Sequence, residues 1–364
     1  MFDPVSIIRP HIQDMPVYEP ILPFEVLSRQ LGRQPEQIVK LDANENPYGI
    51  LPAVRAALAG MPFPNIYPDP GSQALCRALA DYHALPIESI LAGAGADELI
   101  DLIMRLTIDP GDAIINCPPT FGMYPFDGDL NCARVVSVPR REDFSLNLPA
   151  IEAAVREYHP KLIFVASPNN PDGSLVPVPD IKRLLALPIL VILDEAYMEF
   201  APPGSSLLAE ALRWNNLVVL RTFSKWAGLA GLRVGFGAFP VGLMPHLWKI
   251  KQPYNVSVAA STAAIAALQH GTELNEIGQR IITERERLYG LLGTVPYLQS
   301  YPSQSNFILC RVSGRTAADL KKDLAQASVL VRYFDKPGLQ DCIRISVGRP
   351  DQTDILIQTL RSLE

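Results

Sequence analysis

The sequence has no run of lysines or arginines and little excess of either charge. Its 32 Lys and Arg stand against 38 Asp and Glu, which gives a net charge of -6 over 364 residues. Nucleic acids and anionic membranes attract basic patches, so neither is indicated as a partner. No stretch reaches the roughly 18 apolar residues of a membrane span, and the first residues lack the pattern of a secretion signal. We expect a cytoplasmic protein with a small-molecule ligand.

Cysteine is scarce as well. The five cysteines are an odd number without C-x-x-C spacing, and several lie in apolar runs. This pattern indicates buried thiols in a reducing compartment, with no disulfide framework and no metal site. The chain is long enough for a large domain with a smaller one attached.

Short apolar runs alternate with segments of helical periodicity through most of the chain, after a proline-rich start that we expect to form an arm. The runs expected to form strands are 113–116, 134–138, 162–166, 189–193, 217–221 and 234–238. Their alternation with helices predicts an α/β domain with a mainly parallel sheet and helices on both faces. A long helical region at about 256–292 follows. The last part has the order strand, helix, strand, strand, helix, which predicts a small α+β domain.

Polar residues follow three of the predicted strands, at the edge where parallel sheets bind ligands. Asp194 comes directly after the apolar run ILVIL, where a carboxylate needs a cation or serves as a helix cap. A lysine beside an apolar strand and a second cation has its amine form favoured, as attack on a carbonyl requires. The side chains at these strand ends are Asn170, Asp194, Tyr197, Thr222, Ser224 and Lys225.

The segment LAGAGADELIDLI, residues 91–103, is a second candidate element. Glycines 93 and 95 precede a helix start near Ala96, with Asp97 and Glu98 in its first turn. Backbone N–H groups at such a start bind phosphate, although an ordinary capped helix has the same pattern. A dinucleotide loop needs a third glycine where Glu98 stands, which argues against a NAD-dependent dehydrogenase.

Together these motifs resemble those of the histidinol-phosphate aminotransferase family, which are pyridoxal-phosphate enzymes with the aspartate-aminotransferase fold. The resemblance covers most of the chain, and LDANENPYG and PPTFGMY are more specific than the lysine motif. The matching segments, in family order, are LDANENPYG, YPDPGS, GAGADELIDLI, PPTFGMY, SPNNPDG, DEAYMEF, TFSKWAGLAGLRVG and VRYFDKPGLQDCIRISVG.

The resemblance implies fold type I, with a mainly parallel central sheet of the seven-stranded type and a smaller α+β domain. It divides the chain into an N-terminal arm at 1–40 that is part of the small domain, a large domain at 41–290 and a small domain at 291–364. The implied reaction, a step of histidine biosynthesis, is ping-pong transamination of L-histidinol phosphate with 2-oxoglutarate, giving imidazole-acetol phosphate and L-glutamate. The active unit would be a homodimer.

The resemblance also implies how each residue would hold pyridoxal 5'-phosphate. Lys225 would form the internal Schiff base and move a proton, and Asp194 would keep the pyridine nitrogen protonated. Tyr197 and Asn170 would hydrogen-bond the ring hydroxylate, and Phe121 would stack on the ring. The groups implied for the phosphate are the backbone of Ala96 and Asp97, the hydroxyls of Thr222 and Ser224, Arg233, and Tyr67 reaching the neighbouring subunit's cofactor.

Tyr18, Asn170, Arg332 and Arg344 are the implied substrate residues. The arginine pair would take the phosphate of histidinol phosphate or the α-carboxylate of glutamate. Structural ion pairs for both arginines, and a turn-flanking role for Tyr67, are the alternatives. Two positions depart from the family pattern: Asp172 stands where threonine is usual, and Ala96 where serine is common.

Three other functions share parts of this pattern. An aminotransferase of the same lineage that prefers aromatic amino acids is the nearest alternative, followed by a decarboxylase of a phosphorylated amino acid. A pyridoxal-phosphate-binding regulator would need a DNA-binding domain. The roughly 40 residues before LDANENPYG are too few and too rich in proline for one.

Overall fold

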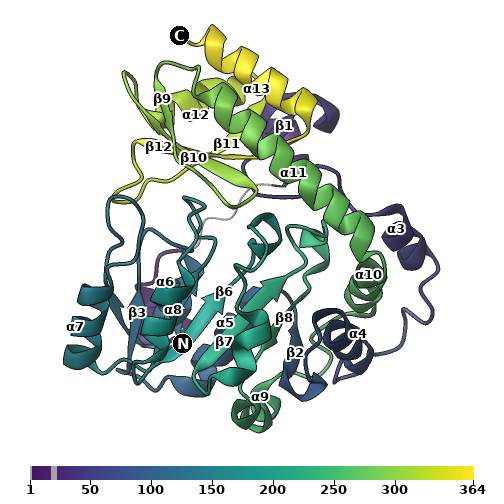
Figure 1. Cartoon of the computed structure of the whole chain (residues 1–364), viewed down its shortest axis with the longest axis vertical. Coiled ribbons are helices and arrows are strands. Elements are labelled where there is room, and N and C mark those ends of the chain that lie inside the picture. The colour runs from purple at the N-terminus through teal and green to yellow at the C-terminus, as the bar shows by residue number, and fades with distance from the viewer. Residues whose placement is uncertain (1, 18–22) are drawn as a thin grey trace.

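The computed structural model describes residues 2–17 and 23–364, whose strands form two sheets. The larger sheet lies in the lower part of Figure 1 and the smaller in the upper part. The strands of the larger sheet, in spatial order, are β2 (Ile90–Gly93), β8 (Gly235–Ala238), β7 (Leu217–Thr222), β6 (Leu190–Asp194), β5 (Leu162–Ala166), β3 (Ala113–Asn116) and β4 (Arg134–Ser137). Only β8 runs antiparallel to its neighbours among these strands, so the expected mainly parallel α/β fold is confirmed.

The central strands are buried on both faces, which is why each is a continuous apolar run. Ile163 and Val165 face one hydrophobic cluster, whereas Phe164 and Ala166 face another. Every predicted strand of this sheet agrees with the structure to within one residue at each end. The strand β2 was not predicted, because most of its residues were assigned to the glycine-containing segment at 91–103.

Helices cover both faces of the larger sheet. One face packs against α4 (Gln73–His83), α7 (Leu148–Tyr158), α8 (Val178–Leu185) and α10 (Val258–Gln269). The other face packs against α5 (Ala96–Thr107), α6 (Met123–Leu130) and α9 (Met244–Ile250). The remaining helices are α1 (Pro10–Gln13), α2 (Phe24–Leu31), α3 (Pro52–Ala59), α11 (Gly271–Leu292), α12 (Ala317–Gln326) and α13 (Pro350–Ser362).

The predicted helical region at 256–292 is two helices in the structure. His270 leaves the helical conformation between α10 and α11, and a Cβ at Gly271 would lie 2.7 Å from the ring of Tyr82. The chain therefore turns at this position, where only glycine fits against the tyrosine. From there α11 runs from the larger to the smaller sheet (Figure 1).

The smaller sheet contains β1 (Val39–Leu41), β11 (Val329–Tyr333), β12 (Cys342–Ser346), β10 (Phe307–Val312) and β9 (Leu298–Ser300), in that spatial order. It forms the small α+β unit that the sequence predicts. Strand β1 pairs with β11, which is about 290 residues away along the chain, so a segment at the end of the predicted arm joins this sheet. The division at residues 40 and 290 stays a proposal.

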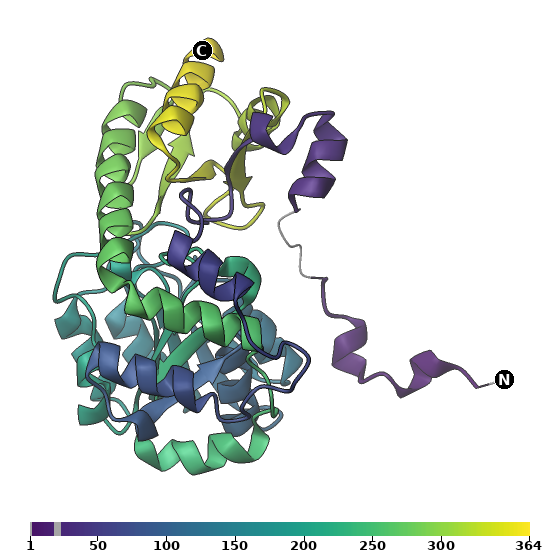
Figure 2. The same ribbon diagram turned by 90° about the vertical axis from the view of Figure 1, so that its right-hand side faces the viewer.

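The N-terminal residues extend outwards from the rest of the chain (Figure 2). Arg9 Nη2 and His11 Nε2 each lie 3.4 Å from the carbonyl oxygen of Leu130, on α6. Among the described residues, no helix combines the length and apolar composition needed to span a membrane.

Candidate active site

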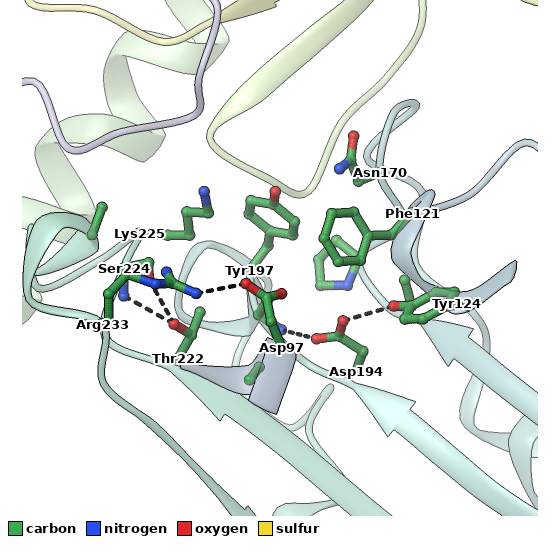
Figure 3. Close-up of a pocket in the computed structure, with 15 residues that line it drawn as sticks. Asp97, Phe121, Tyr124, Asn170, Asp194, Tyr197, Thr222, Ser224, Lys225 and Arg233 are labelled. Atoms are coloured by element: carbon green, nitrogen blue, oxygen red, sulfur yellow. Dashed lines mark hydrogen bonds and ion pairs between the residues drawn. The ribbon is translucent and has the colours of Figure 1, made fainter. Parts of the chain in front are cut away.

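One pocket, here called the lysine pocket, lies at the carboxyl ends of β5, β6 and β7. It brings together all ten residues that the resemblance implies for the cofactor on the same subunit, from five separate segments of the chain (Figure 3). These residues are Ala96, Asp97, Phe121, Asn170, Asp194, Tyr197, Thr222, Ser224, Lys225 and Arg233. Their convergence follows from parallel strand order, which aligns the carboxyl ends of neighbouring strands.

Asp194 lies buried at the base of the lysine pocket. Its Oδ2 accepts a 2.6 Å hydrogen bond from the Tyr124 hydroxyl, and its Oδ1 accepts one of 3.0 Å from the Ala196 N–H. Burial raises the pKa of this carboxyl to about 6, against the opposing effect of these hydrogen bonds. No ion pair joins Asp194 to a cation in the described part of the chain, and its bond from the Ala196 N–H is that of a cap, the other role the sequence allowed.

Lys225 instead extends across the pocket towards the smaller sheet. Its Nζ lies 3.4 Å from the carbonyl oxygen of Ala43 and 5.9 Å from the centre of the Tyr197 ring. The Tyr197 hydroxyl accepts a 3.0 Å hydrogen bond from Asn44 Nδ2. The amine and the phenol therefore face the same space, and both contact the segment that directly follows β1.

The other end of the pocket is suited to an anion. Arg233 Nη2 donates to Asp97 Oδ2 at 2.6 Å, and Thr222 Oγ1 lies 2.8 Å from Ser224 Oγ. Gly95, at the N-cap of α5, has φ of +84°, and a Cβ there would lie 2.7 Å from Arg233 Nη2. This glycine lets the start of α5 approach the arginine, so backbone N–H groups, hydroxyls and a guanidinium gather at one point.

A wider opening, here called the arginine cleft, adjoins the lysine pocket. Both share Phe121, Asn170, Tyr197 and Lys225 in their walls, and the arginine cleft is also lined by Arg332 and Arg344. Arg344 is 5% exposed. Its Nη1 donates to Asn170 Oδ1 at 2.6 Å and its Nη2 to the Asp42 carbonyl at 2.9 Å. The guanidinium is thus fixed in direction beside Asn170, which lines both openings.

One predicted residue, Tyr67, does not line these openings. Tyr67 is 80% exposed and stacks on Tyr254, with ring centres 4.8 Å apart. Tyr18 lies outside the described residues.

Tyr124 and Asn44 are contacts that sequence reasoning missed. Tyr124 is fully buried on the face of the sheet that Asp194 also faces, and burial raises the pKa of its hydroxyl. It lies within PPTFGMY, and Asn44 within LDANENPYG, so the motifs themselves were the available signal. The sequence did not show that Tyr124 contacts Asp194 or that Asn44 contacts Tyr197, because more than 60 residues separate the members of each pair.

The comparisons with known proteins agree with this geometry. A family model for aminotransferase class I and II matches residues 36–360. Histidinol-phosphate aminotransferase 1, chloroplastic, of Arabidopsis thaliana is 56% identical over 98% of this chain and 85% of its own length. The histidinol-phosphate aminotransferase of Roseiflexus castenholzii is 49% identical over 98% of each chain.

A solved structure shows the same fold. The histidinol-phosphate aminotransferase of Sinorhizobium meliloti, in complex with pyridoxal-5'-phosphate, superposes with a TM-score of 0.90 at 30% identity, covering 99% of each chain. The resemblance drawn from the motifs is therefore confirmed. The chain belongs to the aminotransferase class I and II family and, within it, to the histidinol-phosphate aminotransferases.

Proposed function

We propose that the protein transfers the amino group of L-histidinol phosphate to 2-oxoglutarate, with pyridoxal 5'-phosphate as its cofactor. The products are imidazole-acetol phosphate and L-glutamate, formed in a ping-pong sequence. The observation that carries the proposal is the junction of the lysine pocket with a cleft whose lining includes Arg332 and Arg344.

The residues of the lysine pocket fit this cofactor. Asp194 is a buried carboxylate without a cation among the described residues, and it fits a protonated pyridine nitrogen. Phe121 supplies an aromatic face, and the start of α5 with Arg233 supplies donors for a phosphate. When bound, the cofactor withdraws electrons from the substrate carbon that loses its proton.

Lys225 supplies the base. Its Nζ faces the shared space between pocket and cleft, where it can take a proton from the substrate carbon and return it elsewhere. Asn170 and Tyr197 line that space beyond the ends of the adjacent strands β5 and β6, and Asn44 fixes the direction of the Tyr197 hydroxyl. The chain thus provides the base and oriented polar groups around it.

Arg332 and Arg344 supply the anion site. Histidinol phosphate has a phosphate where glutamate has its α-carboxylate, so one arginine pair can serve both half-reactions. Relatives at 49–56% identity are named as histidinol-phosphate aminotransferases, which favours this donor over aromatic amino acids and over decarboxylation.

A direct test compares amino donors. The rate with histidinol phosphate should exceed the rates with phenylalanine and tyrosine under the same conditions, with 2-oxoglutarate as acceptor. Faster turnover of either aromatic amino acid would favour the aromatic aminotransferase instead, and carbon dioxide release without an acceptor would favour the decarboxylase.

The proposed active unit is a homodimer. Tyr67 is exposed with its ring held against Tyr254, which suits a residue that completes the site of a second subunit. If so, mixing inactive Lys225→Ala chains with Tyr67→Ala chains should restore activity, because one site of each mixed dimer has both residues. No gain on mixing, with exchange of subunits demonstrated, would contradict the shared site.

We propose the cytoplasm as the compartment. All five cysteines are free thiols, as a reducing environment requires. The plant relatives are named as chloroplastic. Fractionation of cells that express the protein at natural levels would decide between the two.

A further inference from the structure

The loop where β2 ends and α5 begins, residues 93–96, is here called the phosphate loop. Ala96 and Asp97 start the helix, and the first N–H groups of a helix have no acceptor within it. Both residues line the lysine pocket, where Asp97 accepts from Arg233 (Figure 3). Ala96 has no side-chain hydroxyl to offer a phosphate. Binding of a phosphate at this point therefore depends on the direction of the main-chain N–H groups.

Glu98, in the first turn of α5, holds the phosphate loop although it lines neither opening. Its Oε2 accepts a 2.6 Å hydrogen bond from the N–H of Ala94. The next N–H group, that of Gly95, donates to the carbonyl of Gly93 at 2.8 Å. These two bonds occupy the N–H groups just before the helix, which leaves those at its start for a ligand.

Asn255 holds the carboxylate of Glu98 in this position. Its Nδ2 donates to Glu98 Oε2 at 2.7 Å and to the carbonyl of Ala92, in β2, at 3.3 Å. Both partners are acceptors, so the amide nitrogen must face them. The Oδ1 of Asn255 is buried without a hydrogen-bond partner among the described residues. Burying that oxygen costs free energy, so the two bonds of Nδ2 are what stabilises an asparagine here.

The segment that carries Asn255 is itself fixed to the turn that follows Tyr67. Lys251, which is 8% exposed, donates from its Nζ to the carbonyl of Pro70 at 2.9 Å. Tyr254 has φ of +61°, which is unusual for so large a side chain, and its ring stacks on that of Tyr67. A residue in such a conformation needs surrounding contacts to hold it. This segment therefore joins the Tyr67 turn to the phosphate loop of the same subunit.

We propose that Glu98 and Asn255 position the phosphate loop for the phosphate group of pyridoxal 5'-phosphate. They are positioning residues, because they act through the N–H groups of Ala96 and Asp97 and line neither opening themselves. From the proposed function the proposal takes only the cofactor. It is therefore tested whether or not histidinol phosphate proves to be the amino donor.

The test compares how the full-length protein, freed of cofactor, binds pyridoxal 5'-phosphate and pyridoxal, which lacks the phosphate. Glu98→Ala and Asn255→Ala should each raise the Kd for pyridoxal 5'-phosphate about tenfold, because the loop loses a hydrogen bond to a charged group. The Kd for pyridoxal should change less than about twofold in both variants, since it has no phosphate for the N–H groups to bind.

Two further variants separate the geometry of the loop from the charge of Glu98. In Glu98→Gln the amide oxygen can still accept from Ala94 and Asn255, so the Kd for pyridoxal 5'-phosphate should stay within about threefold of the original. Glu98→Asp keeps the charge but is one carbon shorter, so its oxygen falls out of reach of Ala94 and the Kd should rise. These two variants give the same comparison where an alanine variant does not fold.

The double variant Glu98→Ala, Asn255→Ala tests whether the two residues act together. Both hydrogen bonds of the pair meet at the same atom, Glu98 Oε2. The rise in Kd for pyridoxal 5'-phosphate should therefore be smaller than the product of the two single rises. Rises that multiply would mean that Asn255 does not act through Glu98.

Gln352→Ala and Asn216→Ala are the matched controls. Gln352, in the first turn of α13, also accepts from an N–H just before its helix, that of Arg349, at 2.9 Å. Asn216 Nδ2 donates to two main-chain carbonyls, those of Leu185 and Ile189, each at 3.0 Å. Neither residue lines the lysine pocket or the arginine cleft, so both variants should leave the Kd for pyridoxal 5'-phosphate unchanged.

Three other results would overturn the proposal. Equal rises in the Kd for pyridoxal and for pyridoxal 5'-phosphate would mean that the two residues affect the pocket as a whole. A lower melting temperature of the protein without cofactor, with an unchanged Kd, would mean that they only stabilise the fold. A Kd that rises as much in Glu98→Gln as in Glu98→Ala would mean that the charge of the side chain is what matters.

Discussion

Arg332 and Arg344 lie directly opposite one another on the antiparallel strands β11 and β12. Their guanidinium carbons lie 5.6 and 5.5 Å from the centre of one ring, that of Phe334. Like charges at opposing positions of a sheet repel, so this arrangement is most stable when an anion lies between them. The smaller sheet therefore presents a two-cation site beside Lys225.

Arg332→Ala should lower kcat/KM for histidinol phosphate about 10- to 100-fold, because a charge-assisted contact to the phosphate is lost. The loss with an unphosphorylated amino acid should be much smaller. Arg311→Ala is the control, since Arg311 lines the same cleft but already pairs with Asp341 at 2.8 Å. Equal losses with both donors would assign Arg332 a structural role.

Lys225→Ala should abolish the yellow colour of the purified protein and the covalent adduct that borohydride traps. Lys225 lines both the lysine pocket and the arginine cleft. Absorbance spectra and mass spectrometry after reduction are the measurements. Lys249→Ala, at an exposed position of α9, should retain both signals. An adduct that survives in Lys225→Ala would exclude the assignment.

Asp194→Asn should stabilise the protein without cofactor at neutral pH but lower its activity about 100-fold, because the amide cannot balance a charged pyridine nitrogen. The folded pKa of about 6 lies above the ordinary 3.8, so the folded chain binds more protons between these values. The free energy of unfolding must then fall by up to about 3 kcal/mol as the pH rises from 3.8 to about 6. At higher pH it should stay at the lower value.

The difference in melting temperature between Asp194→Asn and wild type isolates this effect. It should grow as pH rises from about 4 to about 6 and then level off. Asn keeps an acceptor for the Tyr124 hydroxyl, so that hydrogen bond persists. A difference that does not vary with pH would mean that Asp194 is not the titrating group.

Gly95→Ala should weaken cofactor binding. The backbone at Gly95 has φ of +84°, and the added methyl would displace the guanidinium of Arg233. Gly111→Ala is a matched control, since Gly111 has φ of +94° with no atom within 4 Å of the added Cβ. Both changes should cost about 1 to 3 kcal/mol of backbone strain, but only Gly95→Ala should raise the Kd for the cofactor. Equal Kd values for the cofactor in the two variants would show that the methyl group at position 95 does not disturb the cofactor site.

The strands and the residues next to them could be predicted from the sequence. Runs such as LIFVA and LVVLRT are buried on both faces, so their apolar character marks them without knowledge of their neighbours. Asn170, Asp194 and Lys225 follow such runs directly, and the resemblance supplied their roles. The resemblance likewise supplied the roles of Arg332 and Arg344. It did not show that these two residues lie opposite one another on β11 and β12.

The sequence by itself determined the positions of six strands of the larger sheet, the family and the set of residues around the lysine, because each depends on residues close together along the chain. Only the tertiary structure decided the partners of those residues. Tyr124 contacts Asp194 because α6 covers the face of the sheet towards which Asp194 points. Arg344 donates to Asn170, 174 residues away along the chain, because β12 of the smaller sheet lies next to the end of β5. Such pairings depend on strand order and on which face a helix covers, and neither is encoded in local spacing.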